Sequence, residues 1–144
     1  MDRVLILLCL LLIVYIDIKK LSIPNSLTIS LILIGIYYKG GDYFIVERSI
    51  LGMGAYTLPL LILYGYLSDF LKKDVFGFGD IKLLLGLGYI LGYTELYDIY
   101  LYYLISFGVG GMVGLFLGFI RRDFKGEVPF SPFLIMGFLY LWVR

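Results

Sequence analysis

The chain has 144 residues, of which 61% are hydrophobic and 16% are charged, and its mean hydropathy is +0.97. A soluble domain of this length is about half apolar and about a quarter charged, so the composition predicts a single integral membrane domain over residues 1–144. The formal net charge of +1 gives no basic footprint for binding nucleic acid. The sequence contains no histidine, which excludes Ser–His and Cys–His nucleophile pairs and histidine-ligated metal sites, and its single cysteine, Cys9, cannot form an internal disulfide or a zinc cluster.

Charged residues divide the sequence into six apolar segments, which predict an all-α fold, a polytopic bundle of about six transmembrane helices. The segments are 4–16, 21–38, 49–68, 83–94, 99–120 and 128–143. A helix needs about 20 apolar residues to cross the hydrocarbon core of a bilayer. The third and fifth segments reach that length, and the second and sixth nearly do. The first and fourth reach across only if the neighbouring Asp17 and Asp80 lie at or inside the membrane boundary.

Basic residues predict the orientation of the bundle in the plasma (inner) membrane. If the six segments alternate in direction, the Lys and Arg residues divide eight to four between the two sides, and the richer side faces the cytoplasm. The eight are Lys19, Lys20, Lys72, Lys73, Lys82, Arg121, Arg122 and Lys125, and the four are Arg3, Lys39, Arg48 and Arg144. Both termini are therefore expected outside. The same alternation brings Asp17 and Asp80 to one depth at the cytoplasmic face.

Glycine recurs every four residues in two of the segments. Gly88 and Gly92 do so in the fourth segment, and Gly110, Gly114 and Gly118 in the fifth. Such small-residue faces allow helix backbones to approach closely in lipid, so both are predicted to be packing surfaces.

Asp17 and Asp80 are the strongest candidates for chemistry. Placing a carboxylate at membrane depth costs several kcal/mol of free energy, so such a residue is first interpreted as functional. The structural alternatives are that Asp17 merely ends a helix beside two lysines and that Asp80 caps the start of another helix. Two carboxylates in one low-dielectric site cannot both ionise easily, so they share a proton. One can then act as base toward a water molecule while the other donates a hydrogen bond to a scissile carbonyl. This aspartic-protease chemistry requires no metal and no other cofactor.

Three stretches of the sequence resemble the signatures of type IV prepilin peptidases. Residues 17–25 read Asp-Ile-Lys-Lys-Leu-Ser-Ile-Pro-Asn and are similar to the first signature. Residues 77–83 read Gly-Phe-Gly-Asp-Ile-Lys-Leu and are similar to the second. Residues 129–133 read Pro-Phe-Ser-Pro-Phe and resemble the Pro-Phe-Gly-Pro stretch before the last helix, with Ser131 in place of the glycine. The resemblance covers essentially the whole chain.

The resemblance implies a membrane-embedded aspartyl endopeptidase with Asp17 and Asp80 as its catalytic residues. Its partners would be the lipid bilayer and a prepilin, pilin-like or preflagellin protein, whose basic leader it would remove at the cytoplasmic face. Gly77 and Gly79 are expected to shape the loop beside the substrate. Lys82 is expected to pair with Asp80, to position substrate or to extend to the interface. Residues 24–25 are expected to start the second helix.

Longer members of this family carry an N-terminal cytoplasmic segment with Cys-x-x-Cys motifs that is linked to N-methylation of the cleaved pilin. The present sequence resembles the short form of the family, similar to preflagellin peptidases, and is expected to cleave without methylating. A second class of function stays open. A proton-coupled transporter or a non-enzymatic pilus or secretion assembly factor could use Asp17 and Asp80 as relay or structural groups.

Two other protease chemistries are less compatible with the sequence. Presenilin-like proteases share the Gly-x-Gly-Asp pattern, but their Tyr-Asp pair and their Pro-Ala-Leu motif match residues 15–17 and 129–131 poorly. A Ser–Lys peptidase could use Ser22 with Lys19 or Lys20. However, that lysine pair is also explained as a topology anchor.

Overall fold

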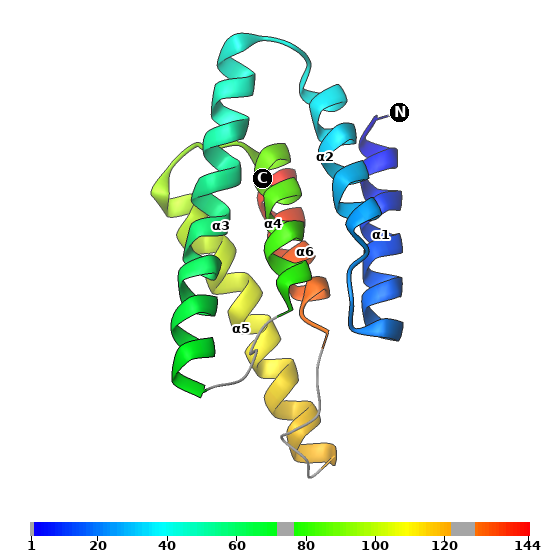
Figure 1. The fold of residues 1–144 in the computed structure, drawn as a ribbon, viewed down its shortest axis with the longest axis vertical. Coiled ribbons are helices and arrows are strands. Elements are labelled where there is room, and N and C mark those ends of the chain that lie inside the picture. The colour runs from blue at the N-terminus through cyan, green and yellow to red at the C-terminus, as the bar shows by residue number, and fades with distance from the viewer. Residues whose placement is uncertain (1, 72–76, 122–128) are drawn as a thin grey trace.

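In the computed structural model, residues 2–71, 77–121 and 129–144 are described, and within these ranges the chain forms six α-helices and no β-strand. The helices are α1 (Asp2–Lys20), α2 (Asn25–Lys39), α3 (Tyr43–Leu71), α4 (Phe78–Leu91), α5 (Leu96–Arg121) and α6 (Ser131–Val143). Successive helices run up and down along the long axis of the molecule (Figure 1). The all-α prediction is therefore confirmed for the described part of the chain.

Among the described residues, two helices are long and apolar enough to cross a membrane. The qualifying stretches are Tyr43–Phe70 of α3 and Leu96–Leu117 of α5, and α6 is a shorter apolar helix. With 19 and 14 residues, α1 and α4 measure about 28 Å and 21 Å, below the roughly 30 Å of a hydrocarbon core. The lengths of α3 and α5 thus support a membrane protein, and a six-span bundle stays a prediction.

The short helix α4 forms the centre of the bundle. Nine of its fourteen residues are buried, and it packs against α2, α3 and α6. A helix that is apolar on all sides is stable only where other elements cover all of it. The side chains of Leu83, Leu84 and Leu87 are fully buried in the shared core. This central position explains why the segment has no polar face.

Backbone-to-backbone contact between Gly52 and Gly88 joins α3 to α4. A Cβ atom added at Gly52 would lie 2.4 Å from the carbonyl oxygen of Gly88, and one added at Gly88 would lie 2.6 Å from that of Gly52. On α5, Gly110 packs against the aromatic rings of residues 130 and 133, whereas Gly114 has open space beside it. The packing face predicted on the fifth segment is therefore confirmed at Gly110 and wrong at Gly114, while the surroundings of Gly118 lie outside the described residues.

The helix ends divide between the two ends of the molecule, and α3 and α5 extend further down than the other helices (Figure 1). The end of α1 and the starts of α2, α4 and α6 lie toward the lower end of the molecule in Figure 1, and the C-terminus and the end of α4 lie toward the other. This alternation is the one assumed in predicting the orientation. Of the basic residues in that prediction, Lys72, Lys73, Arg122 and Lys125 lie outside the described residues.

Candidate active site

Asp17 lies in the last turn of α1, and its carboxylate is buried at 5% exposure. The helix ends when Leu21 adopts a positive φ of 49° and donates its N–H to the carbonyl oxygen of Asp17 at 2.8 Å. The chain then reverses through residues 21–24. Pro24, whose ring fixes φ, precedes the first residue of α2 and accepts the N–H of Leu27 at 3.1 Å. The first motif therefore forms a tight corner with Asp17 on its inner side.

Asp80 lies in the first turn of α4 and is also buried, at 7% exposure. The residue that caps this helix is Gly77, whose carbonyl oxygen accepts the Asp80 N–H at 3.0 Å, and no side-chain capping bond is present there. The alternative that Asp80 serves as the N-cap is therefore wrong. The positive end of the helix dipole favours a negative charge in this turn.

The two glycines of the second motif set how closely α4 approaches its surroundings. A Cβ atom at Gly79 would lie 3.1 Å from the Cβ of Ile23, so a side chain there would press on the corner between α1 and α2. A Cβ atom at Gly77 would lie 3.8 Å from Oδ2 of Asp80. The distance at Gly79 is tight enough to require a small residue, whereas the distance at Gly77 is an ordinary van der Waals contact, so a loop-shaping role for Gly77 stays a prediction. A substrate contact for them remains a prediction.

Lys82 is held by the first motif. Its Nζ donates a hydrogen bond to Oδ1 of Asn25 at 2.8 Å and lies 5.0 Å from the ring centroid of Phe78. The sequence alone is compatible with three roles for Lys82 and with Asn25 at the start of a helix, and it does not indicate a contact between the two residues. The signal available in the sequence was the alternation of helices, which brings the starts of α2 and α4 to the same end.

Ser131 brings the third motif into contact with Asp17. Its Oγ donates a hydrogen bond to Oδ2 of Asp17 at 2.5 Å, and its backbone N–H donates to the same oxygen at 3.3 Å. Ser131 is fully buried and opens α6, where N–H groups have no partner within the helix. In the sequence Ser131 was visible only as a departure from the glycine of the resembled motif, so its bond to Asp17 was also missed.

Three distant stretches of the chain thus meet around two buried carboxylates. The turn that carries Asp80 packs against the corner that follows Asp17, since a Cβ atom at Gly79 would lie 3.1 Å from the Cβ of Ile23. Such a pair can hold one proton between two carboxyl groups and exchange it with a bound water molecule. Within the described residues, no three His, Cys, Asp or Glu side chains are grouped so that they could hold a metal ion.

The Ser–Lys alternative finds no support in the described geometry. Ser22 is exposed on the corner between α1 and α2. The Nζ of Lys19 donates instead to the hydroxyl of Tyr15, four residues earlier in α1, and lies over the same ring. No hydrogen bond joins Ser22 to either lysine among the described residues.

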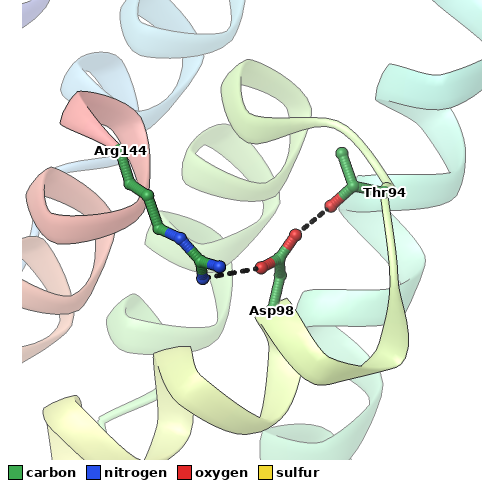
Figure 2. Close-up of polar contacts among 3 residues, drawn as sticks. All are labelled: Thr94, Asp98 and Arg144. Carbon is green, nitrogen blue, oxygen red and sulfur yellow. Dashed lines mark hydrogen bonds and ion pairs between the residues drawn. The ribbon is translucent and has the colours of Figure 1, made fainter.

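A pocket of about 370 Å³ lies at the opposite end of the bundle and is separate from the aspartates. Its lining includes Tyr56, Glu95, Asp98 and Arg144. Figure 2 shows the polar contacts beside it: the Thr94 hydroxyl donates to Oδ2 of Asp98, and Nη1 of Arg144 donates to Oδ1 of Asp98 at 3.5 Å. These contacts tie the end of α6 to the start of α5. The candidate chemistry and this pocket are therefore at different ends of the molecule.

Comparison with known proteins identifies close similarity to one family. Its sequence profile, described as the type IV leader peptidase family, matches residues 4–115. A prepilin leader peptidase/N-methyltransferase of Pectobacterium carotovorum subsp. carotovorum is 32% identical over 134 residues, which cover 89% of the present chain and 46% of that protein. The prepilin leader peptidase/N-methyltransferase of Aeromonas salmonicida strain A449 is 32% identical over 130 residues, covering 88% of the chain and 44% of that protein.

The present chain spans less than half the length of these relatives. The same holds for the prepilin leader peptidase/N-methyltransferase of Legionella pneumophila, which is 29% identical over 125 residues, or 86% of the chain and 43% of that protein. No solved structure gives a significant match.

Proposed function

Since the chain belongs to the type IV leader peptidase family, we propose that it is a membrane-embedded aspartyl endopeptidase that removes the basic leader from type IV prepilins or pilin-like proteins. The observation that carries the proposal is the meeting of Asp17 and Asp80. Both carboxylates are buried, and the motifs that carry them, 63 positions apart (80 − 17), are joined by the hydrogen bond from Lys82 to Asn25. Burying two acidic groups together costs free energy, and a role of the pair in hydrolysis explains why the fold keeps them buried.

The proposed reaction uses one water molecule and one shared proton. The ionised carboxylate takes a proton from the water while the water oxygen bonds to the scissile carbonyl carbon. The protonated carboxyl gives its proton to the carbonyl oxygen, which forms a neutral gem-diol. In the second step the first carboxyl returns its proton to the amide nitrogen, the C–N bond breaks, and one gem-diol proton passes to the second carboxylate. The products are a carboxylic acid and an amine, and the pair regains its starting protonation.

The substrate class follows from the proposed orientation of the helices. We place six helices across the plasma membrane with the Asp17 and Asp80 end in the cytoplasm. The apolar character of α3 and α5 supports insertion into the membrane. The basic residues near the aspartate end support its orientation toward the cytoplasm. A prepilin has an apolar stem that can lie in the bilayer beside the bundle, and its basic leader stays in the cytoplasm. Its scissile bond would then reach the level of the two aspartates.

Purified protein incubated with a panel of prepilins tests this function. Loss of the leader is measured by the mass and the N-terminal sequence of the product. We expect one cut, between the basic leader and the apolar stem. Intact prepilins after incubation with folded protein, together with proton-driven uptake of a solute into proteoliposomes, would favour the transporter alternative.

Cleavage without methylation is a separate proposal for these 144 residues. The proposal is supported by the short connection between α1 and α2 at the aspartate end, which comprises only residues 21–24. A pocket for a methyl donor requires roughly 300 Å³ or more, and a connection of this length is too short to enclose it. Reaction in the presence of labelled S-adenosylmethionine tests it. The product's new N-terminus should carry no added methyl group, and a methyl increment that requires only this protein would contradict the proposal.

A further inference from the structure

The two buried carboxylates differ in the hydrogen bonds that they receive. Oδ2 of Asp17 accepts two, from the hydroxyl and the backbone N–H of Ser131. Within the described residues, the Asp80 carboxylate accepts none. The exposed fractions of the two side chains, 5% and 7%, are nearly equal, so burial alone does not distinguish them.

We propose that Ser131 is a positioning residue that assigns the roles within the pair, holding Asp17 as the ionised base and leaving the shared proton on Asp80. This inference rests on the proposed function. Hydrogen bonds to the charged form of a carboxyl group favour ionisation. Bonds to ionised acceptors are also the stronger ones, and here both converge on a single oxygen.

The charged groups around Asp17 do not supply this asymmetry. On α1, Lys19 and Lys20 are exposed, and Lys19 is bonded to Tyr15. On α4, Lys82 is bonded to Asn25, which leaves Asp80 as the charged group that faces Asp17. The first turns of α2 and α6 contain no acidic residue. The start of α4 favours a negative charge on Asp80 through its helix dipole, so within the described residues the Ser131 donors are the feature that favours the charge on Asp17 instead.

The assignment determines where each proton goes. Oδ2 of Asp17 is occupied by Ser131, so Oδ1 is the oxygen that receives the proton from water. Asp80 carries the proton that passes to the carbonyl oxygen of the substrate. After the C–N bond breaks, the proton on Asp17 has left with the amine, and Asp80 has recovered one from the gem-diol. Each turnover thus restores the hydrogen bonds from Ser131 to an ionised Asp17.

The test is the pH dependence of kcat/KM for prepilin cleavage by the wild type and by Ser131→Ala. The variant keeps the backbone N–H and loses the hydroxyl, so it removes one of the two hydrogen bonds that favour the charged form of the Asp17 carboxyl group. We expect the acidic limb of the profile to move up by about one pH unit or more, from the usual strength of a hydrogen bond to a charged group. Ser131→Thr, which keeps a hydroxyl, should restore the limb toward its wild-type position.

Ser49→Ala is the matched control, because Ser49 is equally buried and its hydroxyl has no partner within the described residues. Its profile should match the wild type. Thermal unfolding in detergent shows whether each variant folds, and Ser131→Gly replaces Ser131→Ala if the latter does not. A folded, hydroxyl-free variant whose acidic limb coincides with the wild type would overturn the inference.

A spectroscopic readout separates this inference from the proposed function. Infrared spectra are recorded for Asp80→Asn and for the double variant Asp17→Asn/Asp80→Asn, both without substrate. The difference between the two spectra contains the carboxyl signal of Asp17 and therefore follows its ionisation. Adding Ser131→Ala should move that transition to higher pH. A wild type that cleaves no prepilin overturns the proposed function and leaves this measurement intact, whereas an unmoved transition overturns the role of Ser131 even in an active peptidase.

Discussion

Lys82 and Asn25 form the hydrogen bond that joins the first motif to the second. The bond is 2.8 Å long, and among the described residues neither group forms a hydrogen bond or ion pair with Asp17 or Asp80. We therefore interpret it as a brace between the starts of α2 and α4 that keeps the two carboxylates in register. A brace of this kind acts on stability more than on the chemical step.

A double-mutant cycle with Lys82→Met and Asn25→Ala tests this interpretation. Each single variant should lose about 1 kcal/mol of stability, the usual net worth of such a bond, and the double variant should lose little more than one of them. Unfolding in detergent measures the free energies. Lys20→Met is the control, since Lys20 is exposed and makes no bond within the described residues. Strictly additive losses would show that the contact contributes nothing.

At the residue scale, the sequence could predict the two aspartates but not what contacts them. One apolar run ends just before Asp17 and another begins just after Asp80, so the alternation of helices was enough to predict both aspartates at one end. The bond from Ser131 to Asp17 spans 114 positions and depends on the register of α6 against α1. That register is set by packing over the whole bundle, and no local pattern encodes it.

At the scale of single elements, charges mark helix ends poorly. The predicted segments 49–68 and 83–94 correspond to α3 and α4, which begin at Tyr43 and Phe78, and both helices extend through charged residues. Backbone hydrogen bonding continues regardless of side-chain charge, so a charged residue near a terminus does not stop a helix. Asp80 consequently lies inside α4, where the helix fixes its direction.

The contact between α3 and α4 depends on Gly52. We expect Gly52→Ala to destabilise the protein by roughly 1–3 kcal/mol, because its Cβ would overlap the backbone of Gly88 and Gly92 and force the helices apart. Gly54→Ala, two residues along the same helix, meets open space and should be neutral or slightly stabilising. Unfolding of both variants in detergent gives the comparison. Equal stability of the two would contradict close packing of α3 on α4.

For the whole molecule, the sequence predicted the number and alternation of helices over the described ranges. It did not predict that α4 is central, because a hydrophobic segment is compatible with either lipid or protein neighbours. The difference lies in the contacts with α2, α3 and α6, which only the assembled bundle defines.

The proposed orientation predicts which connections can be labelled from each side of the membrane. In a Cys9→Ser background, a cysteine at Glu95 should react with an impermeant thiol reagent on intact cells. A cysteine at Ser22 should react only after the membrane is opened. Both positions are exposed, so access decides the outcome. Labelling of position 22 from outside would reverse the orientation and place the aspartates away from the cytoplasm.

The central claim is that Asp17 and Asp80 together perform hydrolysis, and the rate of prepilin leader loss by single Asn variants tests it most directly. Asparagine keeps the shape of aspartate but cannot take up the proton. We predict that Asp17→Asn and Asp80→Asn each lose at least about a hundredfold in rate while remaining folded. Asp69→Asn removes an exposed carboxylate near the C-terminal end of α3 and should cleave like the wild type. Near-normal cleavage by either of the first two variants would contradict the account.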